Sequence, residues 1–319
     1  MQTTSGPGAV PYACAPGSTS PTSSRPEPAM AREYADLYYH VEAILWTGEN
    51  AEICRASAPD GSIVVLKRLR AHKLRERAAL GSLKREARMA MVIHHPNVIS
   101  VTEYIPGPPS PVIVMEYFPS RNLKVRVLDR RGDPLITRRC HDILVQMATA
   151  LLFVHEQGII HMDLKPENFL LSDDCRLKLT DFALAALVAK SWRRFLPRRF
   201  RIAGTRPYIA PETLLRRPPD VRTDIYSFGA TLFEVLARRP PFVSSNRDEL
   251  LNMHLRQPPP WPFTFNRNIT KDINDLIIAM LEKDPDRRPQ SMYDVLSRLK
   301  RLRVFEKPPA ETDVQEGES

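Results

Sequence analysis

Residues 159–171 read IIHMDLKPENFLL, a segment that is apolar at both ends and polar in the middle. It sets Asp163, Lys165 and Asn168 within six positions, between two short apolar runs. Any one of these residues in a loop is usually a capping or solvated group. A carboxylate, an ammonium and an amide at this joint spacing instead indicate a reactive loop.

The segments on either side of this loop differ in their periodicity. Short apolar runs typical of strands come first, and long helical periodicities follow. Residues 136–157 form the longest predicted helix, and Gly158 follows as its C-terminal cap. The predicted strands are residues 41–46, 52–57, 62–69, 112–118, 169–171 and 177–180. The predicted helix face contains Ile136, Cys140, Ile143, Leu144, Met147, Leu151 and Leu152. We therefore expect an α+β fold, with a small sheet-rich N-terminal lobe and a larger helical C-terminal lobe.

The composition is that of a globular protein with a basic surface. The chain has 319 residues, of which 43% are hydrophobic, enough for one large domain or two lobes around a cleft. Lys plus Arg outnumber Asp plus Glu by 46 to 37, which favours anionic partners but is also common on solvated surfaces. Because no apolar stretch reaches the roughly 18 to 20 residues of a membrane span, we expect none.

The two ends of the chain differ in composition from its middle. Residues 1–33 are rich in Pro, Ser, Thr and Gly, and we predict that they are disordered. Residues 306–319 are predicted to form an acidic disordered tail. The folded unit is then 34–305, with the N-terminal lobe at about 34–118 and the C-terminal lobe at about 119–305. The cysteines at 14, 54, 140 and 175 lack metal-site spacing, so we expect reduced structural thiols and a cytoplasmic location.

Seven motifs occur in an order that resembles the eukaryotic-type serine/threonine protein kinases. HMDLKPEN at 161–168 resembles their catalytic loop, and IVVLK at 63–67 and Glu86 precede it. TDFA at 180–183, GTRPYIAPE at 204–212, DIYSFG at 224–229 and DPDRRP at 284–289 follow it. Any one of these motifs arises by chance, whereas the ordered set does not. The resemblance covers nearly the whole folded unit and implies a two-lobed protein-kinase-like fold.

The resemblance implies a role for each polar residue in phosphoryl transfer from ATP. Asp163 would accept the hydrogen of an attacking hydroxyl, and Lys165 would offset charge on the transferring phosphate. Lys67 would hold the nucleotide phosphates, with Glu86 as its ion-pair partner. The ligands of Mg²⁺ (or Mn²⁺) would be Asn168 and Asp181, because this metal prefers hard oxygen atoms.

The resemblance also places ATP against the N-terminal lobe. Backbone groups of Glu116 and Phe118 would contact adenine in an apolar slot. Asp224 would brace the catalytic loop, and Arg288 would pair with Glu212 inside the C-terminal lobe. The remaining nucleotide-binding residues would be Leu45, Gly48, Ile53, Val65, Lys67, Met115 and Leu170.

Three departures from the family pattern affect nucleotide binding and switching. The glycine-rich loop keeps only Gly48, because Trp46 and Ala51 replace the other two glycines. Glycine lets backbone N–H groups approach phosphates closely, so this loss predicts weaker nucleotide binding. Val65 replaces the usual alanine and narrows the adenine slot. Ala183 replaces the glycine after Asp-Phe and makes a flip through positive φ more costly.

Met162 stands where kinases switched by activation-loop phosphorylation generally carry the arginine that receives the phosphate. Between residues 182 and 204 the only hydroxyl side chain is Ser191. Both observations predict a kinase that is not switched in this way. The same segment can dock an acidic partner or nucleic acid, although we favour a solvated basic loop. Its basic and aromatic residues are Lys190, Arg193, Arg194, Arg198, Arg199, Arg201, Trp192, Phe195 and Phe200.

Three functions fit these observations. The intact catalytic and metal-binding set favours an ATP-dependent protein kinase that phosphorylates serine or threonine hydroxyls of protein substrates. The degenerate glycine loop favours a pseudokinase scaffold that signals by binding. A small-molecule kinase of related fold is disfavoured by GTRPYIAPE and DLKPEN, and Thr205 favours serine/threonine over tyrosine acceptors. A nucleic acid partner is not favoured, and the oligomeric state does not follow from the sequence.

Overall fold

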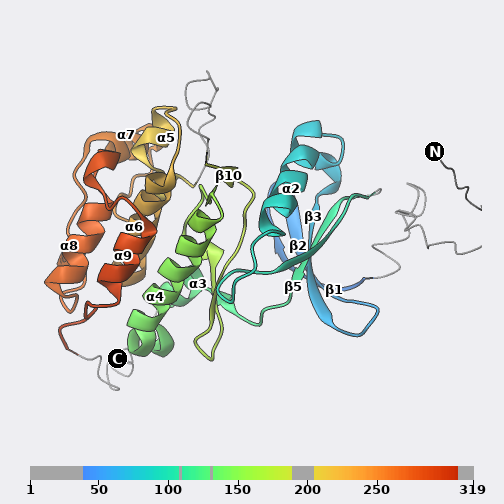
Figure 1. Cartoon of the computed structure of the whole chain (residues 1–319), viewed down its shortest axis with the longest axis horizontal. Coiled ribbons are helices and arrows are strands. Elements are labelled where there is room, and N and C mark those ends of the chain that lie inside the picture. Colours follow the sequence, from blue (N-terminus) through green and yellow to red (C-terminus); the bar gives the residue numbers. More distant parts are fainter. Residues whose placement is uncertain (1–38, 108–109, 130–131, 189–204, 308–319) are drawn as a thin grey trace, which may run out of the picture.

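The computed structural model describes residues 39–107, 110–129, 132–188 and 205–307. Figure 1 shows two lobes, a sheet-rich one built by the first part of the chain and a helical one built by the rest. The predicted α+β architecture is therefore confirmed. The predicted tail at 1–33 lies outside the described residues. At the other end, Glu306 and Lys307 donate their backbone N–H groups to Asn268 at 2.8 and 2.9 Å, so the packed chain continues to residue 307.

Five antiparallel strands form the sheet of the N-terminal lobe, in the spatial order β1-β2-β3-β5-β4. They are β1 (His40–Thr47), β2 (Ala51–Ser57), β3 (Ile63–Leu69), β4 (Val101–Ile105) and β5 (Val112–Glu116). β-branched residues, which suit the pleated surface, begin β3 and make up most of β5. The sequence patterns predicted four of these strands and missed β4. Only the two ends of β4, Val101 and Ile105, are buried, so it lacks the apolar run that marked the others.

One helix of the N-terminal lobe, α2 (Arg77–Ala90), lies beside this sheet (Figure 1). Its buried residues are Leu83, Glu86, Ala87 and Ala90, which recur at the three- and four-residue spacing of one helix face. Glu86 is the one charged residue in that set. The packing of α2 therefore turns a carboxylate toward the sheet.

Two long helices organise the C-terminal lobe. α4 (Pro134–Glu156) begins after Asp133, whose side chain accepts the N–H of Leu135, and Gly158 beyond its end has φ +70°. The predicted helix and its glycine cap are confirmed, although Leu152 on the predicted face is only partly buried. In α6 (Val221–Ala237) every residue after the first two is buried. The other helices are α3 (Leu123–Val127), α5 (Pro211–Leu214), α7 (Arg247–Arg256), α8 (Lys271–Met280) and α9 (Met292–Leu299).

Two small sheets flank the loop of residues 161–168. β6 (Arg121–Asn122), β8 (Phe169–Leu171) and β9 (Leu177–Leu179) form one, and β7 (Ile159–Ile160) pairs with β10 (Ala186–Leu187) in the other. The predicted strands on both sides of the 172–175 turn are confirmed. These sheets fix both ends of the loop against the C-terminal lobe.

The described cysteines, Cys54, Cys140 and Cys175, are buried free thiols. Burial raises the pKa of Cys140 to about 12, so this thiol stays protonated. Within the described ranges, no helix has the length and apolar character that crossing a bilayer requires.

Candidate active site

A buried carboxylate holds the start of the loop at residues 161–168. Asp224 in α6 is fully buried and accepts the backbone N–H groups of His161 and Met162 at 2.7 and 2.8 Å. His155 Nε2 lies 2.8 Å from Asp224 Oδ2. Met162 has φ +70°, a conformation that few non-glycine residues adopt, so these hydrogen bonds stabilise a strained turn. The bracing role expected of Asp224 is confirmed.

Asp163 lies at the centre of a compact polar group. Its Oδ2 is 2.5 Å from Lys165 Nζ, and its backbone carbonyl accepts a 2.8 Å hydrogen bond from Asn168 Nδ2. Thr205 donates its backbone N–H and its hydroxyl to Asp163 Oδ1, each at 2.8 Å. Lys165 Nζ also donates to Thr205 Oγ1 at 2.8 Å. The three residues predicted from the loop are thus brought together, and Thr205 joins them from a distant part of the chain.

Lys67 joins β3, α2 and the segment after β9. Its Nζ lies 2.5 Å from Glu86 Oε1 and 2.7 Å from Asp181 Oδ1. Burial by itself lowers the pKa of Lys67, but the carboxylates of Asp181 and Glu86 outweigh burial and raise that pKa above its usual value. Burial raises the pKa of Glu86, whereas the Lys67 ammonium holds the pKa of Asp181 below its usual range. Lys67 is therefore charged, and its ammonium group faces the carboxylate of Asp181.

Asn168 and Asp181 present oxygen atoms suited to a divalent metal. The backbone N–H of Thr180 donates to the Asn168 carbonyl at 2.9 Å, which places Asp181 next to Asn168. Asn168 Nδ2 donates to the backbone carbonyl of Asp163, so the Oδ1 atom of the same amide points away from that carbonyl. One oxygen of Asp181 receives Lys67, and no residue in the described ranges donates to the other. Amide and carboxylate oxygens are the hard ligands that Mg²⁺ and Mn²⁺ prefer, so the donor set fits such an ion.

Four of the predicted nucleotide-binding residues share one face of the N-terminal sheet. Ile53 pairs with Lys67, and Val65 pairs with Met115. Paired residues share a face, and Val65 and Lys67 are two positions apart, so all four side chains point to the same side. Leu45 differs, because it falls at a register shift in β1 and is 51% exposed.

Three more of the predicted residues, Glu116, Phe118 and Leu170, lie where the chain leaves β5 and in β8. The backbone N–H of Glu116 donates to the Ser100 carbonyl at 3.0 Å, so a ligand contact by Glu116 would use its carbonyl. The Glu116 carboxylate lies 2.8 Å from Lys178 Nζ. Phe118 is buried, and Leu170 packs partly buried against the main core. These residues lie at the junction of the two lobes.

The degenerate glycine loop is covered by its own tryptophan. A Cβ atom placed on Gly48 would come within 2.0 Å of the Trp46 indole, so a side chain at position 48 would require this exposed ring to move. Gly48 N–H donates to the Ala51 carbonyl at 2.9 Å, and Arg70 Nη1 donates to the Gly48 carbonyl at 3.2 Å. Trp46 pairs with Ile53 and therefore lies on the face that carries Lys67. Trp46 thus replaces one glycine of the loop, and its ring covers Gly48, the glycine that remains.

The Asp-Phe-Ala segment packs without strain at its third residue. Phe182 is buried, and its ring centroid lies 5.0 Å from that of His161. Asp181 has φ +68°, whereas Ala183 is not among the described residues with positive φ. Alanine at 183 therefore suits this conformation.

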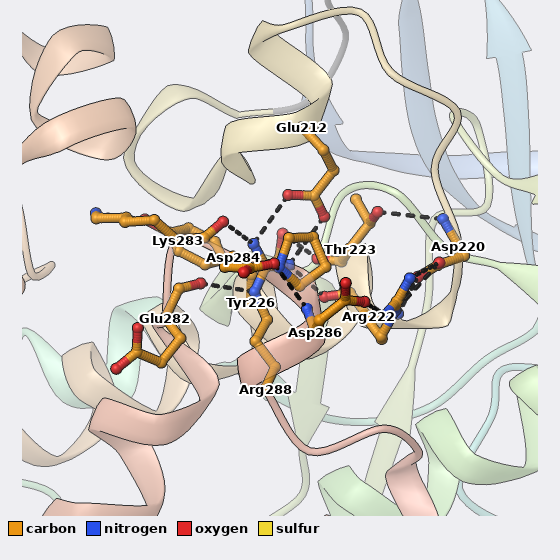
Figure 2. A network of polar contacts seen from close by, with 12 residues as sticks. Glu212, Asp220, Arg222, Thr223, Tyr226, Glu282, Lys283, Asp284, Asp286 and Arg288 are labelled. Atoms are coloured by element: carbon orange, nitrogen blue, oxygen red, sulfur yellow. Dashed lines mark hydrogen bonds and ion pairs between the residues drawn. The ribbon is translucent and has the colours of Figure 1, made fainter.

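A second polar network lies inside the C-terminal lobe, away from Asp163 (Figure 2). Arg288 is 3% exposed and makes two hydrogen bonds to Glu212, from Nη1 at 2.8 Å and from Nη2 at 2.9 Å. It also donates to the backbone carbonyls of Arg222, Glu282 and Lys283. The pairing of Arg288 with Glu212 is confirmed, and its role is structural.

Sequence reasoning missed two features of the site. The sequence pattern assigns Thr205 only to acceptor type, although Thr205 contacts both Asp163 and Lys165. The second feature is a group at the edge of the site, in which Lys124 and Tyr208 meet Glu234 of α6. A lone acidic residue in the apolar run GATLFEVLA was the signal for it. Ser191 and the basic residues at 190–201 lie outside the described residues.

The family model and the related proteins assign this chain to the same family. The model of the protein kinase domain matches residues 39–298. A probable serine/threonine-protein kinase of Streptomyces coelicolor is 33% identical over 258 residues, which cover 79% of this chain and 38% of the relative. The serine/threonine-protein kinase PknB of Mycolicibacterium smegmatis is 31% identical over 251 residues, 77% of this chain and 40% of the relative.

PknB of Mycobacterium tuberculosis matches with the same identity and the same coverage. The chain therefore spans less than half the length of these relatives. The matched residues include both lobes and every element that positions Asp163, Lys67 and Asp181. This chain, with its two-lobed protein kinase fold, belongs to the protein kinase domain family.

Proposed function

We propose that this chain catalyses transfer of the γ-phosphate of ATP to serine or threonine hydroxyls of protein substrates. The observation that carries the proposal is the double ion pair of Lys67, 2.5 Å from Glu86 and 2.7 Å from Asp181. It supports an assembled site, because phosphoryl transfer depends on positioning and countercharge more than on covalent chemistry. We also infer a reducing, cytoplasmic setting from the three buried free thiols.

In the proposed reaction, Asp163 orients the attacking hydroxyl and accepts its hydrogen. Lys165 lies beside this carboxylate and would offset negative charge on the phosphoryl group in transit. Lys67, kept charged by its two carboxylate neighbours, would contact the phosphates that stay behind. Asn168 and Asp181 would hold Mg²⁺ or Mn²⁺, which supplies further countercharge when bound.

The alternative is a pseudokinase scaffold, and the cover of Trp46 over Gly48 is the observation that favours it. An indole on the phosphate-facing side of the loop keeps the backbone N–H groups from close approach. Binding of a partner would then be the main role, with weak or absent transfer. The two candidates differ in one measurable property, the rate of phosphate transfer.

The test is transfer of labelled phosphate from ATP to a generic protein substrate, with Mg²⁺ or with Mn²⁺. We expect transfer by the unaltered chain and its loss in Asp163→Ala and Asp163→Asn. The asparagine variant keeps one acceptor oxygen for Thr205 but cannot take the hydrogen. Asp272→Asn, on the exposed first turn of α8, is the matched control and should transfer normally. Equal transfer by the Asp163 variants, or none by the unaltered chain, would remove the proposal.

A further inference from the structure

Three aromatic side chains reach the surface of the C-terminal lobe from one short turn. Trp261, Phe263 and Phe265 are 47%, 45% and 40% exposed. They lie in and around the 3-10 helix η5 (Pro262–Thr264), between α7 and α8. The centroids of the Trp261 and Phe263 rings are 5.7 Å apart. We call these three residues the aromatic turn. Large apolar side chains that gather on a surface mark an interaction site, whereas isolated ones do not.

Contacts with two helices hold the aromatic turn in place. Asn274 in α8 is fully buried, and its Oδ1 accepts the backbone N–H of Phe263 at 3.4 Å. Asn266 Nδ2 donates to a backbone carbonyl near the end of α6 at 3.0 Å. The Phe265 ring packs edge-on against the buried Phe233 of α6, with 6.0 Å between the centroids. The backbone that presents the three rings is therefore anchored on α6 and α8.

Arginines without carboxylate partners surround the aromatic turn. Arg239 lies over the Phe265 ring, with its Cζ 4.5 Å from the centroid. Arg256 ends α7 before the turn, and Arg267 follows the turn. All three arginines are exposed, and none forms an ion pair with a residue in the described part of the chain. No acidic residue occurs between residues 250 and 271. The surface around the rings therefore attracts an anionic partner.

The size of this patch favours a lipid bilayer over a protein partner. An aromatic side chain covers about 150–250 Å², so three that are nearly half exposed offer roughly 300 Å² together. A stable interface with a protein, or with a second copy of this chain, buries about 800 Å² on each partner. Insertion among lipid headgroups requires no such matching surface. Trp and Phe beside arginine are the residues that anchor proteins there, and anionic lipids supply the opposite charge.

We propose that the aromatic turn anchors this protein to an anionic membrane surface. Trp261 and Phe263 insert among the lipid headgroups, and the flanking arginines contact the lipid phosphates. The contact is peripheral, and it goes beyond phosphate transfer without depending on it. Asp224, which braces the loop at residues 161–168, lies 13 positions before Ala237 at the end of α6, about 20 Å along the helix. The aromatic turn adjoins that end, so the membrane contact is separated from the loop by most of α6.

The first test is sedimentation with vesicles of phosphatidylcholine alone, or mixed equally with phosphatidylglycerol. We expect the unaltered chain to sediment with the mixed vesicles and to stay in solution with phosphatidylcholine alone. Trp261→Ser/Phe263→Ser should weaken binding to the mixed vesicles by at least about tenfold, because two rings lose their contact with lipid. Arg239→Glu/Arg267→Glu should weaken it by a similar factor, because both reversed charges face anionic lipid.

Two controls match these variants in residue type and in charge. Tyr293→Ser removes an aromatic ring that is 66% exposed on α9. Arg75→Glu/Arg77→Glu reverses two exposed arginines of the N-terminal lobe. Both controls should bind the mixed vesicles as the unaltered chain does, and thermal melting shows that each variant keeps its fold. Equal weakening by a control and by its matched variant would assign binding to the surface as a whole and overturn the proposal.

The second test leaves the aromatic turn unaltered, so it decides the matter even where a turn variant unfolds. The tryptophans of the chain are Trp46, Trp192 and Trp261, and Trp46→Phe/Trp192→Phe leaves Trp261 as the only indole. Mixed vesicles with brominated acyl chains should quench its fluorescence, because bromine quenches an indole that reaches the lipid. Sedimentation without quenching would show adsorption by charge alone and overturn the insertion of the turn.

The remaining outcomes identify other occupants of the patch. If the chain does not bind the mixed vesicles, the proposal fails, whatever its rate of phosphate transfer. If it elutes from gel filtration as a dimer that Trp261→Ser/Phe263→Ser separates, and binds no vesicles, a second copy covers the turn instead. Phosphate transfer is measured separately in solution, so its absence would remove the proposed kinase function and leave the membrane contact standing.

Discussion

The backbone N–H of Met162 donates to Asp224 Oδ1 at 2.8 Å, so the loop beside Asp163 is held from inside the C-terminal lobe. This contact comes from a fully buried carboxylate and uses only the backbone of Met162. The Met162 side chain carries no charge and cannot receive a phosphate. The loop is therefore braced without a phosphorylated partner.

Phosphatase treatment is expected to leave activity unchanged. The brace from Asp224 involves no phosphate group. Ser191 is the one hydroxyl side chain between residues 182 and 204, and a phosphate on it would have Arg193 and Arg194 close by in sequence. Turnover of bacterially expressed protein should therefore be equal before and after treatment, and Ser191→Ala should change it little. A tenfold fall on dephosphorylation, about 1.4 kcal/mol in the barrier, that is rescued by Ser191→Asp would contradict this expectation.

Asp181→Ala should abolish phosphate transfer and leave the fold intact. The change removes a proposed metal ligand and one of the two carboxylates beside Lys67. Asp181→Asn is the sharper variant, since asparagine tolerates the left-handed backbone at φ +68° and keeps an oxygen. Transfer by each variant is compared with its thermal melting, and Asp272→Asn serves as control. Normal turnover in both Asp181 variants would rule out this role.

Glycine at positions 46 and 51 should tighten ATP binding. Trp46→Gly removes the ring over Gly48, and Ala51→Gly frees the other end of the turn. One added charge-assisted contact from a backbone N–H would lower the Kd by about tenfold. Titration calorimetry with a non-hydrolysable ATP analogue measures it. The control Trp46→Ala removes the indole without adding the backbone freedom of glycine. If the double glycine variant binds the ATP analogue with equal or weaker affinity, this account of the loop is refuted.

Arg288→Ala should lower the free energy of unfolding by about 3–5 kcal/mol, because it leaves Glu212 charged and unpaired in the interior. Denaturant unfolding measures the change. Arg217→Ala on the surface is the matched control and should stay within about 0.5 kcal/mol. The double variant Glu212→Leu/Arg288→Met should recover part of the loss and no more, since three backbone carbonyls still lose the donor shown in Figure 2. Full stability in Arg288→Ala would show that the pair contributes nothing.

Stability should fall as the pH falls below about 6.5, and His254 should account for part of the fall. Burial and the nearby Lys283 ammonium lower the pKa of His254 from 6.5 to about 3. Between these values the unfolded chain binds more protons than the folded one, so acid favours unfolding. From pH 6.5 to pH 5 the loss is about 2 kcal/mol.

His254→Leu should therefore flatten the pH dependence of unfolding in that window. Leucine fills the site next to the Tyr226 hydroxyl, 2.9 Å from His254 Nδ1, without a group that titrates. Denaturant unfolding at pH 7 and pH 5 gives the slope, and the exposed His40→Leu is the control. An unchanged slope in His254→Leu would assign the acid sensitivity to other groups.

The parts of this protein that depend on neighbours along the chain are predictable from the amino-acid sequence. Local periodicity predicts strands β1, β2, β3 and β5 and helix α4. This periodicity arises because each segment packs on one face. The spacing of Asp163, Lys165 and Asn168 is likewise local, so one loop was enough to place them together. β4 escaped prediction because only its two ends are buried, so it lacks a continuous apolar run.

Contacts between distant segments were decided by the tertiary structure. Lys67 meets Glu86 across 19 positions and Asp181 across 114, and Lys124 meets Glu234 across 110. Family resemblance implied the first contact, but no pattern in the sequence encodes the contacts of Thr205 with Asp163 or of Lys124 with Glu234. Such pairs form because helices and sheets pack as rigid bodies, and the side chains that then face one another depend on that packing and not on their spacing along the chain.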